Sequence, residues 1–450
     1  MSGPVIFLVS AMAGALLLLR RRIGFNLTLT SVLLSFLFLF HGPAYLFYTR
    51  SYGPDTDFFD VIVSAAHGAE VLPTLDMALA LTFVCVCAGV LFVDLATKTS
   101  AAGWRRCLLD WSARPVTVPP ATRTILLLSA GALALFLLVP FVVIDSQLPK
   151  VFEYFTSDLS EFDKIALRRE GGGSSFYLYN LLLGNVIPFV AFGLLAMALA
   201  GVRRTRYWAI GFIALVVVGK AATLSKAPLA VFVLQCAIVW LLLRRLTLSW
   251  RAVAILGTFA FALFLAMTWI ANPSGDEVLV VLEFLFYRVF MIVNESLLEY
   301  FAAIPYVIPH SWGTQASWLA ALFQVEPKLP TYFLVGEVHR GVLGSTTTVM
   351  FMGDAWADFA WFGVVFFSFV AGVVVRWTDI QLVAKRGKTI ASIAGLSLGH
   401  FGLFIALSTS LPTAMLTGGL ILVVPLVVIA SARLPRRSPR PAVVFGPVPE

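Results

Sequence analysis

Apolar runs long enough to cross a membrane recur along this chain, and charged residues gather in the segments between them. The runs cover residues 5–19, 26–48, 75–96, 122–144, 176–201, 207–221, 227–243, 251–271, 347–375, 389–411 and 413–431. A hydrocarbon layer of about 30 Å requires about 20 apolar residues, because an α-helix rises about 1.5 Å per residue. The pattern predicts an all-α polytopic membrane protein of about eleven transmembrane helices, forming a single transmembrane domain over residues 1–450.

Composition agrees with this pattern, since 60% of the residues are hydrophobic and only 12% are charged. Alternate threading of the runs places most of the 32 Lys and Arg on one face and most of the 24 acids on the other. The positive-inside bias makes the basic face cytoplasmic, with the N-terminus outside and the Pro/Arg-rich tail 432–450 inside. The net charge of +8 then reflects topology and anionic lipids, so it does not call for a nucleic-acid partner.

Two of the expected outer segments are longer than simple turns. The first covers residues 145–175 and the second covers residues 272–346. Within the second, residues 278–304 mix apolar positions with several charges, too many for a helix exposed to lipid. We expect this stretch to form a helix that lies in the interface or faces a cavity lined by protein.

Six cations lie beside the outer ends of spans, against the positive-inside bias. They are Arg168, Arg169, Lys220, Lys226, Arg288 and Arg340. Cations at such positions are unfavourable unless they are paired, solvated or able to bind an anion. A diphosphate at the bilayer surface is one such anion, bound through bidentate Arg contacts and Lys point charges. The alternative is that these side chains extend outward into water or pair with outer acids.

Several outer residues are candidates for acid-base chemistry. His339, beside Arg340, is a candidate general base because imidazole titrates near neutral pH; the alternative is an exposed loop histidine. Glu295 is a second candidate base, and Glu299 follows it by one helical turn. Asp354 and Asp358 have the same spacing and are candidate supporting residues, with structural pairing to an outer arginine as the alternative.

Other features narrow the function further. Aromatic residues near the span ends are typical of an interfacial belt: Trp104, Trp111, Trp356, Trp361, Tyr45, Tyr48, Tyr177 and Tyr179. For Tyr177 and Tyr179, stacking on sugar rings is the alternative. Motifs for nucleotide or dinucleotide binding and for zinc proteases are absent from the sequence, and its four cysteines form no paired motif. We therefore expect neither a metal nor a cofactor.

The order of features from about residue 160 to 380 resembles a known family. A basic, Gly-containing outer loop enters a helix (DKIALRREGGGSSFYLYNLLLGNVIPF), and a tight basic turn precedes a span (TLSKAPLAVFVL). An outer segment follows, beginning NPSGDE and continuing into FLFYRVF, and a final loop enters the span GSTTTVMFMGDAWADFAWFGVVFFSFVAGVVVRW. This order resembles the Wzy-type O-antigen polymerases, also called oligosaccharide repeat unit polymerases, and is similar to the enterobacterial common antigen polymerases among them.

The resemblance implies a GT-C-like glycosyltransferase of the bacterial inner membrane that uses no nucleotide sugar. Its substrates would be undecaprenyl-diphosphate-linked oligosaccharides, joined on the periplasmic side into O-antigen or exopolysaccharide. It also implies a chain-length regulator protein as a candidate partner. The family's arginine after the SGDE stretch corresponds to Arg288. Its basic residue in the tight turn, usually Arg, corresponds to Lys226, and Lys would not give bidentate contacts there.

Two alternative functions share part of this pattern. An O-antigen ligase, which transfers the glycan to lipid A core, has a similar topology and donor but one dominant outer loop, whereas this chain has two. A lipid-linked oligosaccharide flippase would need no base and often carries internal repeats, which the helix pattern here lacks.

Overall fold

The computed structural model describes residues 2–66, 70–142, 181–221, 226–247, 278–315, 329–341, 347–431 and 443–444, with scattered positions between 251 and 326. Six helices in this part of the chain are long and apolar enough to cross a membrane: Gly3–Ile23, Leu29–Asp55, Val71–Ala96, Pro120–Leu137, Leu182–Leu199 and Phe351–Arg386. Two shorter apolar helices cover Pro228–Arg244 and Ile390–Ala406. A helical protein with membrane-spanning segments is therefore confirmed, while the count of eleven spans stays a prediction.

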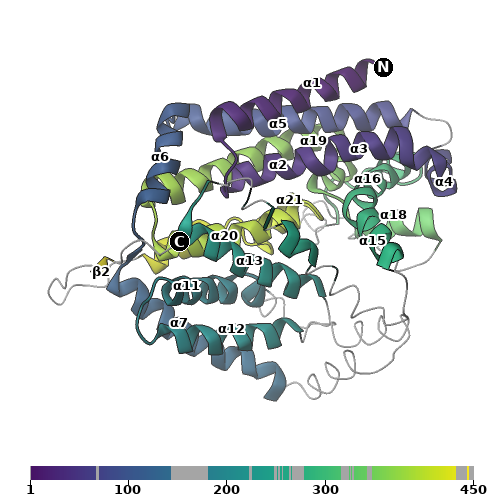
Figure 1. The fold of residues 1–450 in the computed structure, drawn as a ribbon. Coiled ribbons are helices and arrows are strands. Elements are labelled where there is room, and N and C mark those ends of the chain that lie inside the picture. Colours follow the sequence, from purple (N-terminus) through teal and green to yellow (C-terminus); the bar gives the residue numbers. More distant parts are fainter. Residues whose placement is uncertain are drawn as a thin grey trace. The chain divides into compact units, whose positions relative to one another are not determined.

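The chain divides into two compact units, each assembled from separate stretches of sequence (Figure 1). The first unit comprises Met1–Arg106, Thr268–Asp379 and Leu403–Ala414, and the second comprises Cys107–Met267, Ile380–Gly402 and Met415–Glu450. Helices of membrane-spanning length occur in both units. The expectation of one transmembrane domain over residues 1–450 stays a prediction.

The first unit is built from long helices joined by short turns. Its elements are α1 (Gly3–Leu18), η1 (Leu19–Ile23), α2 (Leu29–His41), α3 (Pro43–Phe47), η2 (Tyr48–Tyr52), η3 (Gly53–Asp55), α4 (Asp57–Ser64), α5 (Val71–Ala96), α15 (Val278–Phe286), η5 (Tyr287–Met291), α16 (Ile292–Ala303), α18 (Thr331–Arg340) and α19 (Phe351–Asp379). The helix predicted over residues 278–304 is observed as α15, η5 and α16, which follow one another without a break. Its position in the membrane interface stays a prediction.

Helices α5 and α19 pack backbone against backbone in the middle of this unit, and α1 packs on α5 (Figure 1). A Cβ atom on Gly89 of α5 would lie 2.2 Å from the carbonyl oxygen of Phe369, and one on Gly372 of α19 would lie 2.2 Å from that of Val86. Small residues at such a crossing let two membrane helices approach closely. The two glycines therefore fix where α5 and α19 cross.

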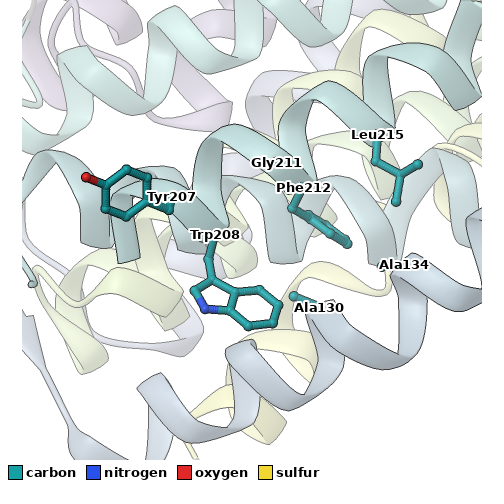
Figure 2. A pocket seen from close by; sticks show the side chains of 7 residues that line it. All are labelled: Ala130, Ala134, Tyr207, Trp208, Gly211, Phe212 and Leu215. Atoms are coloured by element: carbon teal, nitrogen blue, oxygen red, sulfur yellow. The ribbon is translucent and has the colours of Figure 1, made fainter. Parts of the chain in front are cut away.

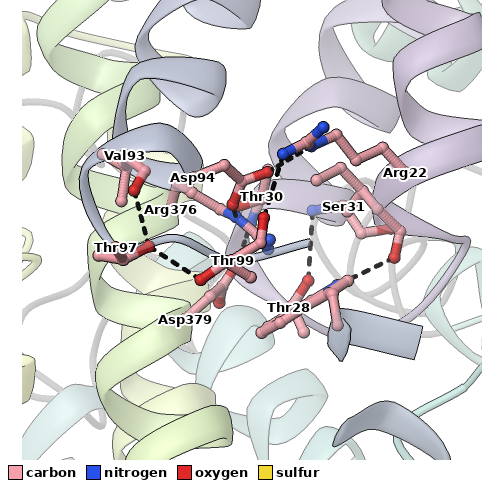
Figure 3. Close-up of polar contacts among 12 residues, drawn as sticks. Arg22, Thr28, Thr30, Ser31, Val93, Asp94, Thr97, Thr99, Arg376 and Asp379 are labelled. Atoms are coloured by element: carbon pink, nitrogen blue, oxygen red, sulfur yellow. Dashed lines mark hydrogen bonds and ion pairs between the residues drawn. The ribbon is translucent and has the colours of Figure 1, made fainter. Parts of the chain in front are cut away.

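One end of the first unit is held by a buried charge cluster (Figure 3). Asp94, near the end of α5, accepts from Nε of Arg22 at 2.6 Å and from Nε of Arg376 at 2.7 Å. The Arg376 guanidinium is fully buried and lies 4.0 Å from the ring centroid of Trp104. Asp379 accepts from the backbone N–H groups of Leu29 and Thr30 and so caps the start of α2. The cluster joins η1, α2, α5 and α19.

The opposite end of the first unit carries a separate polar group. Asp76, near the start of α5, accepts from the hydroxyl of Tyr45 at 2.7 Å and from Nη2 of Arg50 at 2.5 Å. Asp76 and Asp94 are eighteen positions apart on α5, a rise of about 27 Å. The first unit therefore has two polar ends separated by roughly the thickness of a bilayer.

The second unit contains the remaining described spans. Its elements are β1 (Thr117–Val118), α7 (Pro120–Val142), η4 (Leu182–Val186), α11 (Ile187–Leu199), α12 (Thr205–Ala221), α13 (Lys226–Arg244), η6 (Ile380–Arg386), most of α20 (Ile390–Ala406), α22 (Val423–Ala430) and β2 (Val443–Val444). Helices α13 and α20 exchange a reciprocal pair of hydrogen bonds between Gln235 and Ser397, at 2.7 and 2.9 Å.

The last apolar run, expected as one span over residues 413–431, is not a continuous helix. It contains the end of α21 (Leu411–Leu416), a turn through Gly419 at φ +75°, and then α22. The side-chain amide of Asn185 donates to the carbonyl of Thr417 in this turn at 2.8 Å. Because a polar side chain satisfies the exposed backbone, the break is tolerated inside an apolar segment.

Most of the aromatic residues expected in an interfacial belt are instead buried in the protein. Trp104 lies on α6 (Ala101–Ala113), a helix where the sequence indicated only a loop, and donates to the carbonyl of Ile23 at 3.1 Å. Trp111, Trp356, Tyr45 and Tyr48 are also buried, whereas Trp361 is exposed. Tyr177 and Tyr179 lie outside the described residues. The belt interpretation is wrong for the buried five, because their polar atoms satisfy partners inside the fold.

The predicted outer loop 145–175 lies outside the described residues. In the second predicted loop, 272–346, the described parts are α15, η5, α16, the segment up to residue 315, and α18. Of the expected tail 432–450, only Val443 and Val444 are described, and they pair as β2 with β1.

Candidate functional site

Two buried glutamates on α16 form the centre of a polar cluster in the first unit. Glu295 is 6% exposed, and Glu299 follows one turn later with no exposed surface. Glu295 accepts hydrogen bonds at 2.8 and 2.7 Å from the hydroxyl of Tyr287 in η5, and a longer one of 3.5 Å from Tyr48 in η2. Both tyrosines are therefore placed to orient this carboxylate.

Glu299 is satisfied from two segments that follow α16 in the sequence. Its Oε1 lies 3.1 Å from Nη2 of Arg340, and its Oε2 accepts from the hydroxyl of Thr347 at 2.6 Å. Helix α18 ends at Arg340 because Gly341 adopts the left-handed conformation, φ +63°, that favours glycine. The arginine thus emerges from a fixed helix end and is paired to a buried acid.

His339 also attaches α18 to α16. Its Nε2 lies 2.9 Å from the carbonyl oxygen of Glu299, so this nitrogen carries the proton and Nδ1 carries the lone pair. Nδ1 is buried and has no hydrogen-bond partner among the described residues. Burial lowers the pKa of His339 and keeps the ring neutral near pH 7.

Burial has the opposite effect on the candidate carboxylate base. It raises the pKa of Glu295, and hydrogen bonding from Tyr287 opposes the rise. Charge on Glu299 adds to the raised pKa, whereas Arg340 lowers it. The result is a carboxyl group that titrates above its ordinary range, closer to the pH at which a general base works best.

Asp354 and Asp358 occupy the first turns of α19, one turn apart, as the spacing predicts. Asp354 accepts from the hydroxyl of Tyr300 at 3.3 Å. Asp358 accepts from the hydroxyl of Ser311, and from Nε2 of Gln315 at 2.7 Å. These partners are neutral, and no arginine among the described residues pairs with either aspartate.

The six predicted anion-binding cations are divided between the two units and the residues outside the described structure. Arg340 belongs to the glutamate cluster, and Arg288 lies in η5 with an exposed side chain 4.9 Å from the ring centroid of Phe284. Lys220 belongs to the second unit, where it is buried with Nζ 5.7 Å from the ring centroids of Phe232 and Phe401. Arg168, Arg169 and the side chain of Lys226 lie outside the described residues.

The cluster also contains residues for which the sequence pattern indicates no role in a site. Tyr287, Tyr48, Thr347 and Tyr300 supply most of the hydrogen bonds to its acids. The i, i+4 spacing of Glu295 and Glu299 indicates that the two acids share a helical face. The positions of these tyrosines in the sequence follow no pattern that would connect them with the two acids. Among the described residues, no group of three or more His, Cys, Asp and Glu is arranged to hold a metal.

A hollow of about 320 Å³ lies in the second unit and contains none of these candidates (Figure 2). Its lining is apolar, from Ala130 and Ala134 of α7 and from Tyr207, Trp208, Gly211, Phe212 and Leu215 of α12. The indole and phenol rings of Trp208 and Tyr207 are exposed, as for side chains facing lipid.

No model of a known protein family matches the chain, and neither does any curated protein or solved structure.

Proposed function

We propose that this protein polymerises polyprenyl-diphosphate-linked oligosaccharide repeat units on the periplasmic face of the bacterial inner membrane. The chain would have eleven spans, a periplasmic N-terminus and a cytoplasmic C-terminus. The observation that carries the proposal is the cluster of Glu295, Glu299 and Arg340, at the end of the first unit opposite Asp94. The exposed Arg288 follows Tyr287 in η5. Transfer of a glycan from a lipid diphosphate requires a base for the acceptor hydroxyl and cations for the diphosphate, both at the same membrane surface.

The reaction exchanges one bond to the anomeric carbon for another. An acceptor hydroxyl loses its proton to Glu295 as its oxygen bonds to the anomeric carbon of the donor, and the bond from that carbon to the diphosphate breaks. Negative charge grows on the departing diphosphate, so cations already in position lower the barrier. We assign this role to Arg288 and to Arg340, whose side chain is 31% exposed.

Glu295 suits the role of base better than His339. The lone pair of His339 is on a buried Nδ1, and its other nitrogen bonds the Glu299 carbonyl. His339 is therefore assigned as a positioning residue that holds α18, and with it Arg340, against α16. Asp354 and Asp358 keep their supporting role through Tyr300 and the loop at Ser311.

The test is the length of surface glycan, measured by gel in a deletion strain that carries wild-type or variant protein. Glu295→Gln, Arg288→Ala and Lys226→Ala are each expected to convert long ladders into a single capped repeat. Glu283→Gln is the matched control, because Glu283 is an exposed acid on the neighbouring α15.

Other results would point to the alternative functions. Loss of all surface glycan with accumulation of long lipid-linked chains would mean a ligase. Accumulation of single lipid-linked repeats on the cytoplasmic side would mean a flippase. Ladders unchanged in all three variants would remove the proposal.

A further inference from the structure

We infer that a tryptophan beside the glutamate cluster is the stacking platform of a glycan-binding subsite. The Trp312 platform comprises Trp312 with His310, Ser311, Gln315 and Asp358. The inference rests on the proposed function, because it names the surface on which that same site would hold its sugar chain.

The platform is built on a break in α19. Phe359 and Ala360 leave the helical conformation, with φ of −131° and +51°. In an unbroken helix, the carbonyls of Ala357 and Asp358 would accept from residues 361 and 362. Here they accept from the N–H groups of Ser311 at 3.0 Å and Trp312 at 2.9 Å. The break and the loop after α16 therefore form one hydrogen-bonded structure.

The hydrogen bonds between the loop and the break hold Trp312 in an unfavourable backbone conformation. The backbone φ of Trp312 is +54°, in the left-handed region that a residue with a Cβ atom rarely adopts. Trp312 is 59% exposed, so burial of its side chain does not compensate. Strained residues that the surrounding hydrogen bonds hold in place occur preferentially at ligand sites.

The surroundings of the indole favour a sugar over a lipid tail. The Asp358 carboxylate is held by Ser311 and Gln315, and the His310 ring packs edge-on to Trp312 at 6.2 Å between centroids. Irregular backbone of this kind is not exposed to hydrocarbon. A pyranose ring has an apolar C–H face that stacks on indole and hydroxyls that bond carboxylate, amide and imidazole groups.

The platform is linked to the glutamate cluster through buried hydrogen bonds. Asp358 is one turn from Asp354, which accepts from Tyr300, the residue after Glu299. The elements that carry the platform and the cluster, α19 and α16, are therefore joined to each other.

The test measures glycan binding to the full-length protein in lipid nanodiscs by titration calorimetry. The probe is oligosaccharide released by mild acid from the surface polysaccharide of the source strain. Trp312→Gly is expected to weaken binding roughly ten-fold, or about 1.4 kcal/mol. It should be at least as heat-stable as wild type, because glycine adopts positive φ without strain. Trp312→Phe should keep most of the affinity, and Trp208→Ala, an exposed tryptophan in the second unit, should match wild type.

Two results would overturn the subsite. One is wild-type affinity in Trp312→Gly. The other is quenching of tryptophan fluorescence by lipids with brominated tails that disappears in Trp312→Phe, which would make Trp312 a membrane anchor.

The subsite and the proposed function can fail separately. If Glu295→Gln abolishes ladders but Trp312→Gly binds normally, the subsite is wrong and the polymerase stands. If Glu295→Gln, Arg288→Ala and Lys226→Ala leave ladders unchanged while Trp312→Gly loses glycan, the polymerase is wrong and the subsite stands.

Discussion

Tyr287 donates a hydrogen bond to the carboxylate of Glu295, the proposed general base. Its hydroxyl lies within hydrogen-bond distance of both carboxylate oxygens. Burial raises the pKa of Tyr287 as well, so the phenol keeps its proton and remains a donor. A donor of this kind favours the ionised form of Glu295 and therefore opposes the rise in pKa that burial causes.

We predict that Tyr287→Phe shifts the acid limb of the activity profile to higher pH. Without the hydroxyl, the raised pKa of Glu295 rises further, and the base is protonated over a wider range below neutrality. The measurement is repeat-unit transfer in membrane vesicles as a function of pH. Tyr207→Phe, which alters an exposed tyrosine on α12, is the control and should leave the profile unchanged. An unshifted acid limb in Tyr287→Phe would show that Glu295 is not the titrating base.

At the residue scale, the sequence predicted the acids of the cluster better than their partners. Glu295 and Glu299 share a helical face by spacing alone, and Arg340 stands out as an outer cation. The pairing of Glu299 with Arg340 crosses 41 positions, and that of Tyr48 with Glu295 crosses 247. Local periodicity carries no information about such contacts, because they depend on which helices pack together.

At the scale of elements, α19 is two helices in one apolar run. Hydropathy predicts a single span, because the break at Phe359 and Ala360 contains no proline, glycine or charge. The close approach that fixes the break is at Gly363, where a Cβ atom would lie 2.1 Å from the carbonyl oxygen of Ala355. Backbone proximity of this kind is invisible in the sequence.

We predict opposite effects of two small substitutions at this break. Gly363→Ala should destabilise the protein by about 1–3 kcal/mol, because the new methyl group meets a backbone carbonyl. Ala360→Gly should leave stability unchanged or raise it by about 1 kcal/mol, because φ +51° is unstrained for glycine. Thermal unfolding in detergent measures both.

Gly131→Ala is the control for these variants. It adds the same methyl group in α7, where nothing lies within 4 Å of the new atom. Equal melting temperatures for Gly363→Ala and the control would show that α19 is not broken as described.

At the scale of the whole molecule, the polar ends of the first unit agree with the charge pattern of the sequence. The segments around Arg22, Asp94 and Arg376, all expected on the basic face, meet in one cluster. Tyr48, Asp76 and Glu295, expected on the outer face, lie at the other ends of the same or neighbouring helices. Hydropathy and charge therefore predicted the relative threading of α1, α2, α5 and α19. The division into two units could not be predicted, because each combines stretches far apart in the chain.

We predict that the two polar ends of the first unit differ in their accessibility to a reagent added outside the cell. In a background with all four native cysteines changed to serine, Ser51→Cys should react with a membrane-impermeant maleimide in intact spheroplasts. Lys98→Cys should react only after permeabilisation. Both positions are exposed, so the difference reports topology. The reverse pattern would place the glutamate cluster in the cytoplasm and contradict the proposed periplasmic reaction.

The charge cluster at Asp94 also constrains how the protein is made. Arg22 and Asp94 leave the ribosome early, whereas Arg376 follows Asp94 by 282 positions, after the stretch that supplies most of the second unit. Until then, the nascent chain holds Asp94 with only one of its two arginines. The first unit therefore completes its assembly late in translation. A chain that stops before Arg376 is left with an incompletely paired acid at its membrane border, the kind of defect that membrane proteases and chaperones detect.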